Sequence, residues 1–210
     1  MKIKAILCLC LCFGGISLGF ARLCCAVPET AATLARLQTL TSSIVTLQCN
    51  FTQRTDILLF VEPVVSKGKM RFHAPDKLVW EIEKPLNEGF VLNGGSGYRW
   101  ERSKAERRAF KTSDDPLAAL VGKQLRAWLT FDQKWLLSKY AITVEGEAPM
   151  RLSLTPKNAD AASLISAIRI TFNENGAANS VELQESKGNK TVIQFEDIHV
   201  NESIEEREFE

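Results

Sequence analysis

The stretch Ser66-Lys67-Gly68-Lys69-Met70-Arg71-Phe72-His73-Ala74-Pro75-Asp76-Lys77-Leu78-Val79-Trp80 contains two predicted β-strands and the turn between them. In its first half, large apolar side chains alternate with basic ones, which is the pattern of a strand with one wet face. Ala74-Pro75-Asp76 has the composition of a turn. In the second half and just beyond it, Leu78, Trp80 and Ile82 share one face of the next strand. The stretch therefore predicts an antiparallel sheet with one apolar face.

The rest of the chain extends this sheet and adds helices. We expect strands at Val64–Phe72, Lys77–Glu83, Phe90–Asn93, Tyr98–Glu101, Ala141–Glu145, Arg151–Thr155, Ala167–Phe172, Ser180–Glu185 and Thr191–Glu196. Leucine and isoleucine at spacings of three and four predict a helix from Pro28 to Leu47. Ser113-Asp114-Asp115-Pro116 predicts the start of a second helix, which Gly122 could break in two. A short third helix is expected near Phe131–Leu137. The order of elements indicates an α+β fold, a single domain with one strongly curved antiparallel sheet and helices on one side.

The first 26 residues have the features of a secretory signal peptide. Two lysines precede an apolar run from Ala5 to Phe20, which at roughly 16 residues is shorter than the ~20 needed to span a bilayer. Cleavage is expected after Ala26 or alternatively after Ala21, which leaves a domain of residues 27–210. We therefore expect a protein exported by the Sec pathway to the periplasm of a Gram-negative bacterium.

Cysteine content and charge narrow the class of protein further. Cleavage after Ala26 leaves Cys49 as the only cysteine, so no disulfide framework is expected. The same cleavage removes three basic residues and moves the formal charge from +1 to −2. A nearly neutral protein gives no reason to expect a nucleic-acid partner.

Catalytic residues are scarce. The chain has two histidines, His73 and His199, and neither accompanies a nucleophile elbow or metal-ligand spacing. The adjacent carboxylates Asp114 and Asp115 are better explained as helix caps than as an acid–base pair. We therefore expect no enzyme activity, no metal and no cofactor, with an exported hydrolase as the enzymatic alternative.

Several short motifs in this order resemble the LolA family of periplasmic lipoprotein carriers. They are Phe51-Thr52-Gln53, Gly68-Lys69-Met70-Arg71-Phe72, Pro75 with Leu78 and Trp80, Pro85, Asn93-Gly94 before Tyr98 and Trp100, Leu154-Thr155-Pro156-Lys157, Ile170-Thr171-Phe172 with Asn175-Gly176, and Thr191–Phe195 with Asn201. The resemblance implies an unclosed, strongly bent antiparallel barrel, or half-barrel, covered by about three helices. It also implies a monomeric, non-catalytic carrier that takes acylated cargo from an inner-membrane exporter to an outer-membrane acceptor.

With this resemblance, the large apolar residues of strands and helices become candidates for lining a preformed acyl-binding cavity. They are Phe51, Met70, Phe72, Leu78, Trp80, Ile82 and Trp100 on strands, and Leu117, Leu120, Leu125 and Trp128 on the second helix. Ala74 occupies the position where relatives carry an arginine that latches the helical cover to the sheet. Two other functions fit the same fold: a carrier of glycolipids or lipid-linked pigments, and a lipid-sensing regulatory domain.

Overall fold

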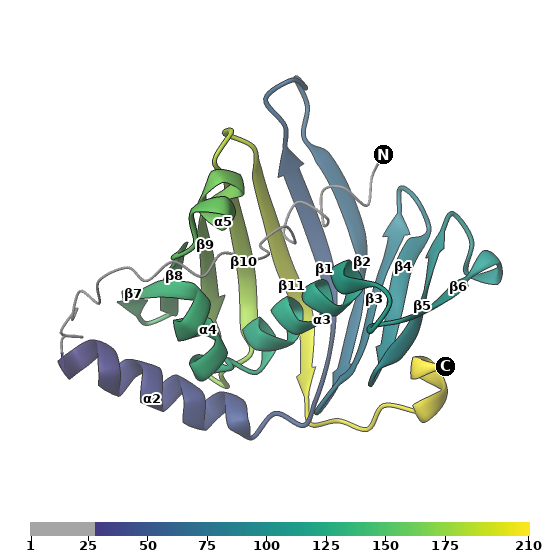
Figure 1. The fold of residues 1–210 in the computed structure, drawn as a ribbon. Helices are drawn as coiled ribbons and strands as arrows, with labels where there is room; N and C mark the ends of the chain where they lie inside the picture. The colour runs from purple at the N-terminus through teal and green to yellow at the C-terminus, as the bar shows by residue number, and fades with distance from the viewer. Residues whose placement is uncertain (1–27) are drawn as a thin grey trace.

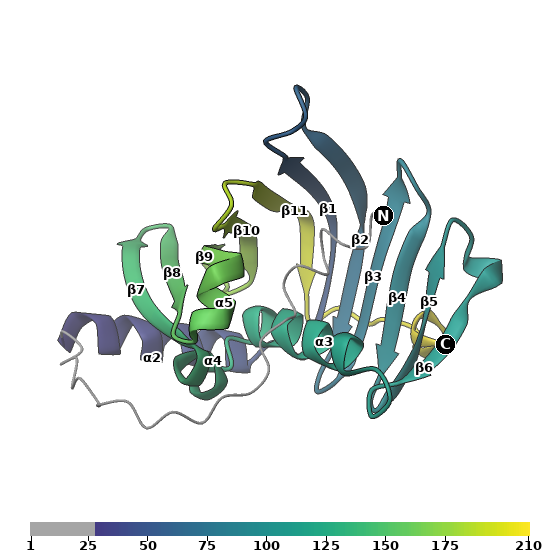
Figure 2. The same ribbon diagram turned by 45° about the horizontal axis from the view of Figure 1, so that its top comes forward.

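The structure is a computed structural model that describes residues 28–210, without the side chains of Pro28, Glu29, Lys104, Pro116, Leu117 and Leu120. The predicted signal peptide lies outside the described residues. One antiparallel sheet of eleven strands dominates the fold, in the order β6-β5-β4-β3-β2-β1-β11-β10-β9-β8-β7. The sheet bends around one side, where α3 and α4 lie (Figures 1 and 2).

The described strands form two consecutive blocks along the chain. The strands are β1 (Thr46–Asp56), β2 (Val64–His73), β3 (Lys77–Lys84), β4 (Glu88–Asn93), β5 (Ser96–Glu101), β6 (Arg108–Lys111), β7 (Tyr140–Glu147), β8 (Met150–Pro156), β9 (Ile165–Phe172), β10 (Ala178–Glu185) and β11 (Lys190–Val200). The helices are α2 (Pro28–Ser42), α3 (Pro116–Leu129), α4 (Gln133–Lys139) and α5 (Ala159–Leu164), with 3₁₀ turns η1 (Lys104–Glu106) and η2 (Glu206–Phe209).

The topology is two meanders joined side by side. Strands β1 to β6 form one and β7 to β11 the other, and β1 pairs with β11 along most of its length. The edge strands β6 and β7 have no partner beyond them in this order, so the sheet is not closed. This confirms the predicted fold class, a curved, unclosed antiparallel sheet with helices against it.

The first helix is shorter than predicted. It ends at Ser42, and Leu47 lies on β1 instead of on the helix. Two causes meet at this point. The hydroxyls of Thr41, Ser42 and Ser43 donate to carbonyls three or four residues back, and the β-branched residues 44–46 favour extended backbone. Leu47 continues the apolar spacing of the helix although it lies on β1, because the sheet buries its side chain.

The other helix predictions need smaller corrections. Helix α3 continues through Gly122, whose missing side chain lets the helix approach β4, since a Cβ there would lie 2.2 Å from Leu92 Cδ1. Helix α5 was not predicted. It is only six residues long, and it begins at Asn158, whose side chain caps the backbone N–H groups of Asp160 and Ala161.

The two faces of the sheet carry separate apolar clusters. The main cluster fills the concave side and includes residues of both meanders, α2, α3 and α4. A small cluster on the convex side consists of Val79, Val91, Trp100 and Phe209. Phe209 comes from the C-terminal turn η2, which packs against β3 and β4. The chain end therefore covers one patch of the outer face.

Candidate functional site

Helices α3 and α4, here called the helical cover, cross the concave side of the sheet (Figures 1 and 2). The chain leaves β6 and enters α3 at Asp115, whose carboxylate accepts a hydrogen bond from Ala118 N at 3.0 Å. Asp132 caps α4 in the same way through Trp135 N. Asp115 thus serves as a helix cap, as expected for the Asp114-Asp115 pair.

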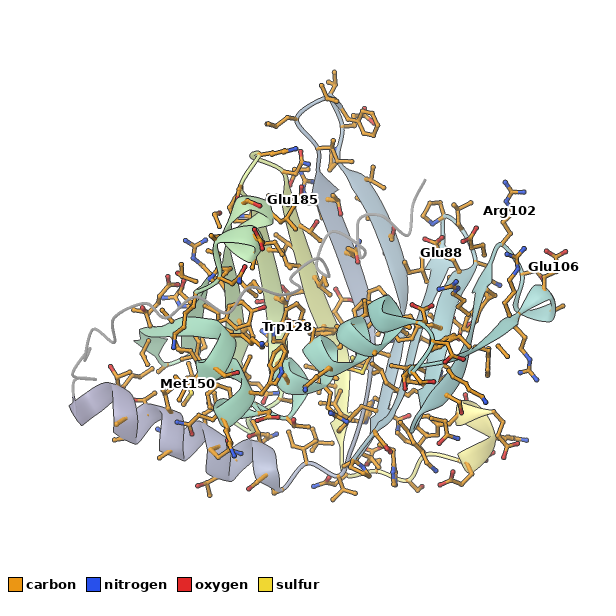
Figure 3. All side chains as sticks on the ribbon, viewed as in Figure 1. Glu88, Arg102, Glu106, Trp128, Met150 and Glu185 are labelled. Carbon is orange, nitrogen blue, oxygen red and sulfur yellow. The ribbon has the colours of Figure 1, made fainter. Side chains whose placement is uncertain are left out.

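Most of the predicted lining residues come together under this cover. The sheet contributes Phe51, Met70, Phe72, Leu78, Trp80 and Ile82, and α3 contributes Leu125 and Trp128. All belong to the main apolar cluster, and none is more than 8% exposed. Figure 3 shows Trp128 at the end of α3 that adjoins α4. The side chains of Leu117 and Leu120 lie outside the described residues.

Trp100 was predicted to line the same site, and that prediction is wrong. It lies opposite Gly89 on β5, on the face that carries Val79 and Val91, and it belongs to the convex cluster. Its indole Nε1 donates to Asn87 Oδ1 at 2.9 Å. Strand alternation correctly places Trp100 on the same face of β5 as Tyr98, and the two rings lie 5.9 Å apart. It does not tell which face of the sheet is concave.

The second meander supplies lining residues that the motif search did not single out. Leu152, Leu154, Ile168, Ile170 and Phe172 are buried in the main cluster, and Phe131 packs edge-on against Phe172 at 6.1 Å between ring centroids. Their strict alternation on β8 and β9 was the available signal. Gln124, a buried polar residue on α3, was also missed.

An aromatic stack spans β2 at the centre of the concave face. The Phe51 ring lies 4.2 Å from the Trp80 ring, with an interplanar angle of 24°, and Phe195 meets Trp80 edge-on at 6.4 Å. Phe51 reaches across because its neighbour on β2 is Gly68, where a Cβ would lie 2.6 Å from the Phe51 ring. This explains why the predicted strand carries a glycine on its apolar face.

The space between cover and sheet is mostly filled by side chains. A pocket of about 190 Å³ remains at the edge of α3, with Phe72, Leu78 and Leu92 in its floor and Lys123, Arg126 and Asp76 among its charged lining residues. Ligand sites for small molecules usually measure ~300–1,000 Å³. Among the described residues, this pocket is smaller than such a site, and large side chains of the main cluster occupy the concave face beside it.

Among the described residues, a small number of polar contacts join the cover to the rest of the fold, including Lys157 Nζ, which donates to the Leu137 carbonyl at 2.6 Å. Arg99 on β5 pairs with Asp115 at 2.8 Å, and Tyr140 on β7 donates to Gln124 Oε1 at 3.0 Å. Arg126 Nη1 donates to the carbonyl of Pro75 at 3.4 Å. Ala74, where the resemblance in sequence led us to expect the position of a latch arginine in relatives, adjoins that carbonyl and is half-buried against the main cluster. In this chain, the arginine that reaches this loop comes from the cover.

Three buried N–H donors in the site have no hydrogen-bond acceptor among the described residues. They are Trp80 Nε1, Gln124 Nε2 and Trp128 Nε1. Each residue is at most 3% exposed. A buried donor without a partner costs roughly 1–3 kcal/mol. The closed arrangement therefore leaves hydrogen-bonding capacity unused at the centre of an apolar site.

Cys49 lies on β1 in the main cluster and is 6% exposed. Burial raises the pKa of its thiol to about 12, because the thiolate would lose its hydration. The thiol is therefore protonated at neutral pH and is not an activated nucleophile.

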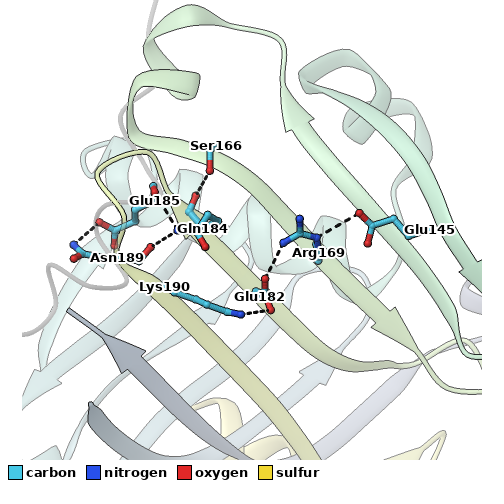
Figure 4. A network of polar contacts seen from close by, with 8 residues as sticks. All are labelled: Glu145, Ser166, Arg169, Glu182, Gln184, Glu185, Asn189 and Lys190. Carbon is cyan, nitrogen blue, oxygen red and sulfur yellow. Dashed lines mark hydrogen bonds and ion pairs between the residues drawn. The ribbon is translucent and has the colours of Figure 1, made fainter. Parts of the chain in front are cut away.

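Other polar side chains form ion pairs and hydrogen bonds at the surface. On the convex face, Arg169 pairs with Glu145 at 3.4 Å and with Glu182 at 2.8 Å, and Lys190 also pairs with Glu182 (Figure 4). His199 contacts Glu202 at 2.9 Å. Within residues 28–210, no group of three or more His, Cys, Asp or Glu side chains is placed to hold a metal. No helix in that part of the chain is long and apolar enough to cross a membrane.

The loop between β1 and β2 exposes an apolar tip, defined as Leu58, Leu59, Phe60 and Val61. These side chains are 72%, 90%, 54% and 104% exposed. The hairpin extends beyond the neighbouring strands (Figures 1 and 2). A contiguous exposed apolar patch of this kind marks a contact site for protein or membrane.

Comparison with known proteins identifies the family. The model of the outer membrane lipoprotein carrier protein LolA matches residues 42–210. The chain belongs to the LolA family. This confirms the resemblance seen in the sequence motifs.

Individual relatives agree with this assignment. An outer-membrane lipoprotein carrier protein of Chromohalobacter salexigens is 28% identical over 145 residues, covering 69% of this chain but only 65% of that relative. One from Pseudomonas fluorescens is 26% identical over 177 residues, covering 84% and 82%. These relatives are named as carriers, not as enzymes.

The fold also matches solved structures. MucB superposes with a TM-score of 0.52 at 15% identity, over 88% of this chain and 63% of that chain. A chain of the Pseudomonas aeruginosa MucA/MucB complex gives a TM-score of 0.51 at 14% identity, over 87% of this chain and 60% of that chain. At this identity the likeness concerns the fold alone.

Proposed function

We propose that this LolA-family protein is a periplasmic carrier that shields the acyl chains of a lipoprotein between the sheet and the helical cover. One observation supports the proposal above all others. A continuous apolar concave face is covered by two short helices that few polar contacts attach to the sheet. Lipoprotein is the favoured cargo because the matched family and its named relatives are lipoprotein carriers.

The physical need for such a cover follows from the cost of wetting an acyl chain. Each methylene exposed to water costs about 0.8 kcal/mol, so a chain of about fifteen costs on the order of 12 kcal/mol. The cargo must be covered, yet it must also be released without ATP hydrolysis. If the cover moves away and the acyl chain takes its place on the same apolar face, the two exchange similar amounts of buried area. Uptake and release then need only a small net change in free energy.

The apolar tip is suited to contact a membrane when cargo is loaded and when it is released. Four consecutive uncharged side chains on a narrow hairpin form a convex contact that a deformable bilayer accommodates readily. We propose that the tip touches the membrane while cargo is exchanged with an inner-membrane exporter or an outer-membrane acceptor.

Replacing Leu59 and Val61 by serine should reduce flotation with phosphatidylethanolamine vesicles and leave the unfolding midpoint unchanged. Unchanged flotation would refute this role.

Mass spectrometry of protein isolated gently from periplasm tests the cargo. We expect a bound triacylated or diacylated polypeptide. A co-purifying glycolipid or pigment would replace the lipoprotein assignment by that alternative, and a protein that carries no acylated molecule would contradict the carrier function.

A binding assay tests the site. Trp80→Glu and Trp128→Glu should each weaken binding of a fluorescent fatty-acyl probe at least tenfold, since a buried charge replaces apolar contact. Circular dichroism establishes that each variant is folded. Unchanged affinity in folded variants would exclude the concave face as the binding site.

A further inference from the structure

The three buried donors that find no acceptor among the described residues come from both layers that would enclose a ligand. Gln124 and Trp128 lie four residues apart, on the same side of α3. Trp80 lies on the concave side of β3, against Phe51 and Phe195. The Oε1 atom of Gln124 accepts from Tyr140, which leaves Nε2 as the free end of the amide.

The chemistry of these groups selects one kind of ligand atom. All three donors are neutral, and all are at least 97% buried among aliphatic and aromatic side chains. A carboxylate or phosphate would bring a charge into this apolar surrounding at high cost. An ester or amide carbonyl brings an uncharged acceptor attached directly to an alkyl chain. Pure hydrocarbon would bury the donors again without an acceptor.

We propose that Trp80 Nε1, Gln124 Nε2 and Trp128 Nε1 donate hydrogen bonds to the ester or amide carbonyls of the cargo. The proposal rests on the carrier function and adds a selection rule to it. The linkage between acyl chain and head group enters the site together with the chain. The protein therefore prefers esterified or amidated fatty acids to ethers and alkanes of equal length.

A matched pair of lipids tests this rule. Didecanoylglycerol and its ether counterpart didecylglycerol have the same carbon skeleton and differ only in the two carbonyl oxygens. Each is used to displace dansyl-labelled undecanoic acid from the full-length protein. With about a threefold to tenfold gain for each hydrogen bond formed, the ester should displace the probe at several-fold lower concentration.

Variants that remove only the donors locate the effect. Trp80→Phe, Trp128→Phe and Gln124→Met each remove one N–H donor and leave an apolar side chain in its place, so each should lower the ratio of ester affinity to ether affinity. Trp100→Phe is the matched control, because its indole lies on the convex face and already has an acceptor. It should retain the full ester preference.

A second measurement does not depend on the stability of the variants. In a ¹⁵N-labelled sample, the indole N–H signals of Trp80 and Trp128 should move downfield with the ester and not with the ether, whereas that of Trp100 stays in place. Equal displacement by both lipids, or a preference that survives all three donor variants, would overturn the selection rule alone. Failure of both lipids to displace the probe would overturn the carrier function and this rule with it.

Discussion

At the scale of single residues, Cys49 shows how burial controls reactivity. Its raised thiol pKa, about 12, predicts that iodoacetamide at pH 8 leaves Cys49 unmodified in the folded protein and modifies it in denaturant. Mass spectrometry of the peptide that carries Cys49 measures the extent of modification in the folded and in the denatured protein. Rapid modification of the folded protein would show that β1 is more open than the structure indicates.

The same pKa shift predicts how stability depends on pH. Above about pH 9, the unfolded thiol loses its proton while the buried one keeps it until about pH 12. The contribution of Cys49 is therefore fully present below pH 9 and is lost as pH rises towards 12. Cys49→Ala should remove this part of the decline, measured as free energy of unfolding between pH 8 and 11.

Gly68 is the residue on which the aromatic stack depends. A Cβ at this position would lie 2.0 Å from the Glu81 carbonyl oxygen, and that backbone atom cannot move aside easily. Gly68→Ala should lower the free energy of unfolding by about 2–3 kcal/mol. Gly95→Ala is the control, because the nearest atom there is Thr112 Oγ1 at 3.9 Å, and it should change stability by less than about 0.5 kcal/mol.

At the scale of elements, the start of α3 is tied to the sheet through the Arg99–Asp115 pair. Because Arg99 is about half exposed, the pair contributes at most about 1 kcal/mol to stability. Arg99→Ala should therefore leave the unfolding midpoint nearly unchanged, yet it should accelerate entry of a fluorescent acyl probe measured by stopped flow. Asp115 keeps its helix cap in this variant.

Arg169→Ala provides the matched control for that experiment. It removes an exposed arginine pair of similar geometry from the convex network of Figure 4, away from the cover. Probe entry should keep its wild-type rate. Equal acceleration by both variants would indicate a general loosening of the sheet, and no acceleration by Arg99→Ala would indicate that α3 does not limit entry.

Elements with a strong local signal were predictable from the sequence. The 66–80 stretch forms β2, the turn and β3, because alternation and turn residues act locally. The start of α3 was predictable for the same reason. The end of α2 was not, since the apolar spacing runs on into β1. Trp100 was assigned to the wrong face because alternation along β5 does not show which face of the sheet is concave.

At the scale of the whole molecule, the chain end closes the convex cluster. Phe209 is buried between Val79, Val91 and Trp100, and the Tyr98 hydroxyl donates to the Glu210 carbonyl. Phe209→Ala should lower the free energy of unfolding by about 3 kcal/mol. It should not change the affinity for an acyl probe in the folded protein, because the binding face is on the other side. A large loss of affinity would contradict this separation of the two faces.

The sequence by itself determined the strands, the amphipathic helices, the lack of catalytic motifs and the family, since these depend on neighbouring residues or on short motifs in order. The tertiary structure decided the rest. The register of β3, β4 and β5 places Trp80 and Trp100 on opposite faces of the sheet, and the bend of the sheet makes the face of Trp80 the concave one. The same packing brings side chains of the cover against the concave face and buries three donors that find no acceptor among the described residues. These are consequences of contacts between residues far apart in the chain, which no local pattern encodes.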